Sequence, residues 1–142
     1  MILQTVFTVV DVETTGGRPG IDRVIEVGAV KVRGGKIVDS FETLINPRRI
    51  IPPVISGITG ITNNMVSRAP SFFEVSDDLR EFIGESIFVA HNAIFDFQFL
   101  STEFILATHP PLSNPYLCTI KLARRIFPGL THYNLGDLCR TL

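Results

Sequence analysis

Three runs of β-branched and apolar residues open the sequence and limit the folds available to it. They cover residues 6–14, 23–33 and 36–45, and the last two are joined only by Gly34 and Gly35. A Gly-Gly link between such runs is a strong hairpin signal, because a type I′ turn needs positive φ at both central positions. The sequence therefore predicts an antiparallel three-stranded meander at the start of the chain.

Past this meander, helical and extended patterns alternate. Amphipathic spacing predicts helices over residues 71–84, 93–108, 118–127 and 133–142, and an apolar run predicts a short strand over 86–90. Ser71 is the expected N-cap of the first helix and Gly84 its stop. Residues 46–70 are rich in turn formers and predict a surface loop with one or two short helical turns. This order indicates an α/β fold, a mixed sheet with helices packed on it.

Composition limits the class of protein. With 142 residues, 45% of them hydrophobic, the chain is long enough for a core, and we expect residues 1–142 to form a single domain. No apolar run approaches the ~20 residues of a membrane-spanning helix, and the N-terminus lacks the features of a signal peptide. Cys118 and Cys139 are too few for a disulfide scaffold. We therefore expect a cytoplasmic protein with reduced thiols and no membrane partner.

Two acidic residues end the first apolar run. Asp11 and Glu13 are two positions apart, so on a strand their side chains project from the same face. Like charges held that close repel each other unless a cation lies between them. The pair therefore indicates either a cation site or a solvated strand end.

A third acidic residue follows the short strand at 86–90. Asp96 lies between Phe95 and Phe97, in the first turn of a helix that is otherwise nearly free of charge. It could simply favour the helix dipole, but a carboxylate among so much apolar surface is costly unless it is paired or bound to metal. If the two strands are neighbours, Asp11, Glu13 and Asp96 form a cluster of three carboxylates. Oxygen-only clusters suit Mg²⁺ or Mn²⁺.

Three segments together resemble the DnaQ-like 3′–5′ exonucleases, a family that includes the proofreading subunit or domain of bacterial replicative polymerases. The segments are DVETTGG at 11–17, HNAIFDFQFL at 91–100 and YNLGDLC at 133–139. The likeness runs from about Val6 to the end of the chain, and D-x-E-T-T-G combined with H-N-x-x-F-D is highly specific. The resemblance implies a ribonuclease H-like fold and an exonuclease of single-stranded DNA 3′ ends, with a DNA polymerase subunit as a partner.

The resemblance also implies roles for individual residues. Asp11 would bridge two divalent ions, Mg²⁺ or Mn²⁺, while Glu13 holds the ion that activates water and Asp96 supports the other. Contacts to the terminal nucleotide are expected from Thr14, Thr15, Gly16, Ile58, Ile61 and Asn92. Simpler roles stay open for all six residues: turn formation for the first three, anchoring of the loop for the isoleucines, and orientation of the helix start for Asn92.

The family's third motif, a histidine followed five positions later by an aspartate, supplies a general base and a fourth acid. His132 and Asp137 have this spacing, but we expect them to be a decoy: a loop residue and a solvated helical position. In the family an LxxLC segment precedes the motif, whereas here LGDLC contains Asp137 itself. The motif is then expected roughly fifteen residues past Cys139. We therefore expect the domain to lack its C-terminal helix and the site to be incomplete.

Three functions follow from these observations. A net charge of −1 argues against coating of duplex nucleic acid, but not against an enzyme that grips a few nucleotides at one end. The leading hypothesis is a DNA exonuclease acting in proofreading or repair. An exoribonuclease keeps the same chemistry, since nothing in the sequence reads the 2′-OH. The third hypothesis is a catalytically incomplete domain that docks onto a polymerase.

Overall fold

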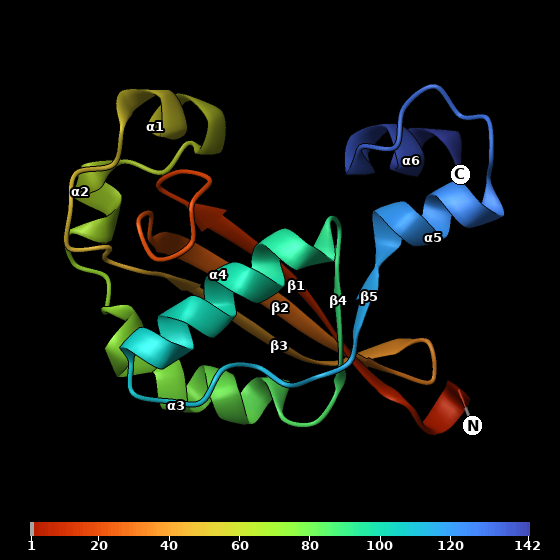
Figure 1. Cartoon of the computed structure of the whole chain (residues 1–142), viewed down its shortest axis with the longest axis horizontal. Coiled ribbons are helices and arrows are strands. Elements are labelled where there is room, and N and C mark those ends of the chain that lie inside the picture. The colour runs from red at the N-terminus through yellow and green to blue at the C-terminus, as the bar shows by residue number, and fades with distance from the viewer. Residues whose placement is uncertain (1) are drawn as a thin grey trace.

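The structure, a computed structural model, describes residues 2–142 and is built on a five-stranded sheet (Figure 1). The strands are β1 (Val6–Thr14), β2 (Val24–Arg33), β3 (Lys36–Leu44), β4 (Ile87–Ala90) and β5 (Tyr116–Cys118). Their order across the sheet is β3-β2-β1-β4-β5. The first three strands pair antiparallel, whereas β4 pairs parallel to β1 and β5 parallel to β4. The predicted meander and mixed sheet are confirmed.

The helices also follow the predicted order. After a short 3-10 turn over Ile2–Gln4, they are α1 (Pro53–Thr59), α2 (Asn63–Val66), α3 (Phe72–Ile83), α4 (Ala93–Leu106), α5 (Thr119–Ile126) and α6 (Leu135–Thr141). The turn-rich loop carries the short helices α1 and α2, as expected. Strand β5 was not predicted, because a strand of this length is too short to show an alternating pattern. In residues 2–142, no helix has both the length and the apolarity needed to cross a bilayer.

Local capping explains where α3 begins and ends. The Ser71 hydroxyl accepts a hydrogen bond from the Glu74 amide, and the Glu74 carboxylate accepts one from the Ser71 amide at 2.7 Å. This reciprocal pair is a capping box, which satisfies two of the free amides at a helix start. Gly84 ends the helix with φ of 52°, a conformation that glycine adopts without a steric penalty. The predicted cap and stop are confirmed.

Helices α3 and α4 cover one face of the sheet (Figure 1). Along β1, Val10 and Val12 are buried in the core between the sheet and these helices, together with Phe99 and Phe104 of α4. Each fully buried side chain of this size contributes about 1.5–3 kcal/mol of hydrophobic free energy. The alternation along β1 therefore directs its even-numbered residues into the core and its odd-numbered residues to the opposite face.

A smaller apolar cluster anchors the segment between β3 and α3. It consists of Ile25, Ile51, Ile61 and Val66, all at most 4% exposed. This cluster lies apart from the main core and fixes the segment that carries α1 and α2 to the start of β2. The C-terminal helices α5 and α6 follow β5 and lie beyond the edge of the sheet that β5 forms, away from α1 and α2 (Figure 1).

Candidate active site

The end of β1 presents two carboxylates on the face opposite α3 and α4. In the ladder with β2, Asp11 lies opposite Gly28, and Glu13 lies opposite Glu26. A register irregularity follows between Glu13 and Thr14, where β1 leaves the regular ladder. Such irregularities locally increase strand twist and can redirect side chains. Asp11 and Glu13 therefore share a face at a point where the strand begins to bend away from its partner.

Both side chains are held in surroundings that disfavour their charge. Partial burial raises the pKa of Asp11, and the attraction of nearby His91 partly offsets this. Burial also raises the pKa of Glu13, and the neighbouring carboxylates of Asp11 and Glu26 raise it further. Among the ion pairs of residues 2–142, none includes Asp11 or Glu13. A cation near this strand end would relieve the repulsion.

Asp96 reaches the same place from α4, because β4 is shorter than β1. The two strands pair only over Phe7–Val9, so the far half of β1 has no strand beside it on that edge in the described chain. After β4 ends, Asn92 takes a left-handed conformation with φ of 68° and starts α4. The Asp96 carboxylate then accepts the free Val12 amide at 3.0 Å. The helix thus supplies an acceptor that the missing strand would otherwise provide.

The environment of Asp96 disfavours its charged form. Its side chain is 3% exposed. Burial raises its pKa to about 7; the Val12 amide opposes this rise, whereas the charges of Asp11 and Glu13 add to it. The three carboxylates are therefore close enough to interact electrostatically. A buried carboxylate so perturbed, next to two others, is a frequent mark of a functional site.

The three carboxylates provide the oxygen-only ligands that Mg²⁺ and Mn²⁺ prefer. Within residues 2–142, however, no group of three or more His, Cys, Asp or Glu side chains is already gathered around one point. The donor set thus fits a divalent ion in chemistry, and the three side chains would have to be drawn together by the ion.

The turn after Glu13 is ordered by its own residues. The Thr14 hydroxyl donates to the Gly16 carbonyl at 2.5 Å, and the Thr15 amide donates to the Arg23 carbonyl at 2.8 Å. A Cβ on Gly16 would lie 2.6 Å from the Asp22 carboxylate, so a larger residue here would displace the Asp22 side chain, which accepts the Arg18 amide. Thr14 and Thr15 are buried. The turn role expected for these three residues is confirmed.

The two isoleucines of the SGITGIT segment differ in position. Ile58 lies on α1 and is 76% exposed, whereas Ile61 is 4% exposed and packs in the smaller apolar cluster. The expected contact of Ile61 with substrate is therefore corrected: its side chain is a core anchor, because the turn after α1 directs it inward against Ile25 and Val66. Ile58 keeps its apolar surface free.

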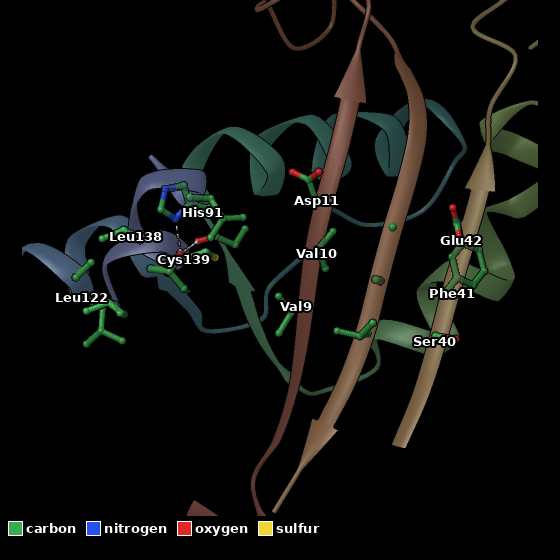
Figure 2. Close-up of a pocket in the computed structure, with 18 of the residues that line it drawn as sticks. Val9, Val10, Asp11, Ser40, Phe41, Glu42, His91, Leu122, Leu138 and Cys139 are labelled. Atoms are coloured by element: carbon green, nitrogen blue, oxygen red, sulfur yellow. Dashed lines mark hydrogen bonds between the residues drawn. The ribbon is translucent and has the colours of Figure 1, made fainter. Parts of the chain in front are cut away.

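An apolar groove of about 780 Å³ adjoins Asp11 on the face opposite α3 and α4 (Figure 2). Figure 2 shows Asp11 and Val9 on β1, with His91, Leu122 and Leu138 on the other side. His91 bridges two segments there: its Nε2 donates to the Tyr133 carbonyl at 2.8 Å, and its Nδ1 lies 2.8 Å from the Thr119 hydroxyl. Asp11 is thus open to the solvent along the groove.

The pair with the third-motif spacing lies on the C-terminal segment. His132 is exposed in the loop before α6, and Asp137 lies in the first turn of that helix. The Asp137 carboxylate accepts hydrogen bonds from the Asn134 side chain and from Arg140, and these hydrogen bonds lower its pKa. Asp137 therefore makes the contacts of an ordinary acidic residue near a helix start.

Sequence reasoning missed a second buried carboxylate on α4. Glu103 is 2% exposed and pairs with Arg23, whose Nε and Nη2 both donate to its carboxylate at 2.8 Å. The signal that identified Asp96, an acidic residue on a charge-poor apolar helix, applies equally to Glu103. The spacing of seven residues between them places both on about the same face of α4.

Comparisons with known proteins agree with this geometry. Residues 8–142 match the family described as Exonuclease. The chain is 44% identical, over 93% of its length, to the DNA polymerase III subunit epsilon of Treponema pallidum. It is 41% identical, over 99% of its length, to the DNA polymerase III PolC-type of Oceanobacillus iheyensis. It spans 62% of the first of these relatives and only 10% of the second.

A solved structure of exonuclease X in complex with 5′ overhanging duplex DNA has a similar fold. The TM-score is 0.75 at 33% identity, with 95% of this chain and 72% of the other chain aligned. The predicted ribonuclease H-like α/β fold is confirmed.

Proposed function

Because this chain belongs to the exonuclease family, we propose that it is a metal-dependent 3′–5′ exonuclease that removes nucleotides from single-stranded DNA. The observation that carries this proposal is the position of three interacting carboxylates, Asp11, Glu13 and Asp96, at the open end of β1. The PolC-type and epsilon relatives support a role beside a DNA polymerase, in proofreading or repair in the cytoplasm. The DNA-bound exonuclease X supports DNA as the substrate.

The three carboxylates have distinct parts in this proposal. Asp11 would bridge two Mg²⁺ or Mn²⁺ ions, with Glu13 holding one and Asp96 the other. Such ions, when bound, activate water and stabilise the charge on the attacking and leaving oxygens of a phosphodiester. The Val12 amide fixes one Asp96 oxygen, at 3.0 Å, and so orients the other oxygen of the same carboxylate. Val12 and α4 thereby keep Asp96 at the reacting end of β1.

The substrate would be held by groups around this strand end. The backbone of Thr14, Thr15 and Gly16 lies directly after the carboxylates and would contact the terminal nucleotide. Ile58 offers exposed apolar surface to a base or sugar, a contact that tolerates any sequence. Asn92 is exposed at the start of α4 and would contact the same nucleotide. This arrangement suits an enzyme that grips a chain end and does not read its sequence.

The decisive experiment measures release of mononucleotides from a 3′-labelled single-stranded DNA with Mg²⁺ or Mn²⁺. The Asp11→Asn variant is expected to lose about 10²–10⁴-fold in rate, since ion coordination supplies several kcal/mol of transition-state stabilisation. Asp78→Asn is the matched control, because Asp78 is exposed on α3. Metal-independent release, or equal rates in the two variants, would reject the proposal.

Competition between substrates tests the finer assignment. A 3′-ended DNA strand and an RNA strand of the same sequence are supplied together, and the preferred substrate is the one consumed first. Preference for RNA would replace DNA as the substrate while keeping the chemistry. Calorimetric titration with Mn²⁺ separates a further case: uptake of Mn²⁺ with no release from either strand would favour a domain that docks onto a polymerase.

A further inference from the structure

Glu103 is a buried charge that the proposed chemistry does not use. Its carboxylate receives three hydrogen bonds: Arg23 donates through Nε and Nη2, both at 2.8 Å, and the Val24 amide donates at 3.1 Å. The Glu103 side chain is 3% exposed and the Arg23 side chain 28%. A bidentate pair in such a position fixes both orientation and distance. Glu103 therefore ties α4 firmly to the start of β2.

Arg23 also closes the loop that follows β1, the strand that carries Asp11 and Glu13. Its backbone amide donates to the Thr15 hydroxyl at 2.9 Å, and its carbonyl accepts the Thr15 amide at 2.8 Å. Inside the loop, the Asp22 carboxylate accepts the Arg18 amide at 2.9 Å. The loop of residues 14–23 is thus internally ordered, and Arg23 is its link to the helix behind it.

Helix α4 holds both strands that border this loop. Asp96 accepts the Val12 amide of β1, and Glu103 accepts the Val24 amide of β2. These two carboxylates are seven residues apart, which is about 10 Å along a helix. A rigid helix pinned at both points fixes the direction in which the loop leaves the sheet. Without Glu103, α4 would keep its apolar packing on the sheet and the hydrogen bond from Val12 to Asp96, but it would lose the polar contacts that hold the start of β2.

We propose that Arg23 and Glu103 are positioning residues that hold the 14–23 loop where its backbone meets the terminal nucleotide. The inference rests on the proposed exonuclease function and extends it to residues that touch neither metal nor substrate. The loop carries Thr14, Thr15 and Gly16 directly after Asp11 and Glu13, so a shift of the loop misplaces the nucleotide relative to the carboxylates. A misplacement of about 1 Å can cost ~10²-fold in rate.

Kinetics on two substrates test this role. In Glu103→Gln and Arg23→Lys, kcat/KM on an oligonucleotide is expected to fall about 10–100-fold, with most of the loss in kcat, because the bound nucleotide is misplaced relative to the carboxylates. Hydrolysis of bis(p-nitrophenyl) phosphate, which has no nucleotide to position, should change less than about 3-fold. Arg33→Gln is the matched control, because Arg33 is an exposed arginine at the far end of β2. Equal losses on both substrates would overturn the proposal.

A double variant guards against simple unfolding. Removing one partner leaves a buried group unpaired, which can destabilise the whole domain. Arg23→Gln with Glu103→Gln removes both charges and keeps an oxygen for the Val24 amide. This variant should melt cooperatively near the wild-type temperature and still show the selective loss on the oligonucleotide. Full recovery of oligonucleotide activity in the double variant would overturn the proposal, since it would make a charged bidentate pair unnecessary.

Loop order can be measured without any catalysis. The sequence contains no tryptophan, so Ile21→Trp introduces a unique fluorescent reporter at a loop position that is 53% exposed. Its time-resolved anisotropy should show rapid local motion once Glu103→Gln is added, but not once Arg33→Gln is added. Unchanged anisotropy with Glu103→Gln would overturn the inference. If Glu103→Gln increases the local motion of the loop but the wild-type protein releases no nucleotide, the exonuclease function would be rejected. The role of Glu103 in holding the loop would still be supported.

Discussion

Asp96 and Asp137 both lie in the first turn of a helix, yet their surroundings give them opposite properties. Asp96 is buried, binds the backbone of β1, and has a pKa of about 7. Asp137 is partly exposed, binds Asn134 and Arg140 within its own segment, and has a lowered pKa. Capping and the helix dipole account for Asp137. Within residues 2–142 no cationic side chain pairs with Asp96, so its carboxylate suits a metal ion better than that of Asp137.

The largest expected difference is in activity. Asp96→Asn should reduce metal-dependent release of nucleotides about 10²–10⁴-fold, because it removes a ligand charge from the proposed ion site. Asp137→Asn should change the rate less than about 3-fold, because its contacts are local and solvated. The same 3′-labelled DNA assay measures both. An equally large loss of rate in Asp137→Asn would contradict this difference between the two residues and would assign His132 and Asp137 to the catalytic site.

Metal binding should separate the two residues in stability. At pH 8, Mn²⁺ at about 100 times its Kd should stabilise the wild-type protein by about 3 kcal/mol. Thermal melts should show the increase in Tm for Asp137→Asn as well, but not for Asp96→Asn. A Tm increase that survives Asp96→Asn would place the ion elsewhere.

The pH dependence of the metal-free protein should have opposite signs at the two positions. The folded state holds the pKa of Asp96 at about 7, above its ordinary value of 3.8, so folding favours the protonated form. The stability that this preference contributes is present below pH ~4 and is lost as the pH rises through ~7. Asp96→Asn imitates the protonated form and should therefore be more stable than wild type at pH 8, by about 1–3 kcal/mol.

Asp137 should behave in reverse. Its folded pKa is lowered, so its contribution to stability is present at neutral pH and is lost as the pH falls below its ordinary value. Asp137→Asn should slightly lower Tm at pH 8 and have no effect in strong acid. Urea unfolding of both variants across the pH range, with EDTA present, checks the two signs. A gain in stability on acidification that is the same in wild type and Asp96→Asn would contradict the assignment.

The smallest effect concerns how α4 begins. Asn92 has φ of 68°, in the left-handed region where a Cβ costs free energy and asparagine is tolerated better than most residues. Asn92→Ala should destabilise the domain by about 1 kcal/mol, and Asn92→Gly by less, because glycine has no Cβ. Urea denaturation at pH 7 measures both. Equal losses in the two variants would mean that the Asn92 side chain, not its backbone conformation, sets the start of α4.

Local features of the sequence predicted most of the fold. Gly34 and Gly35 indicated the hairpin, and Ser71 with Gly84 bounded α3, because turns and caps depend on a few adjacent residues. The alternation in β1 placed Asp11 and Glu13 on one face. The helical position of Asp137 also followed from the local pattern.

Contacts between distant residues were beyond such reasoning. The inward position of Ile61 depends on packing against Ile25 and Val66, and the pair of Arg23 with Glu103 joins residues 80 positions apart. A periodic pattern says which face a residue occupies, but not which element will lie against that face.

The sequence by itself thus determined the strands, the helices and the kinds of residue available for chemistry, since these follow from backbone geometry and side-chain period. Only the tertiary structure decided which acidic residues are buried and what they bind. β4 pairs with only the first half of β1, which leaves the Val12 amide without a strand partner on that edge in the described chain. Helix α4 lies there, and the Asp96 carboxylate accepts this amide. Burial and a shared strand end gave Asp96 its raised pKa, and these arise only when the sheet and α4 are packed together.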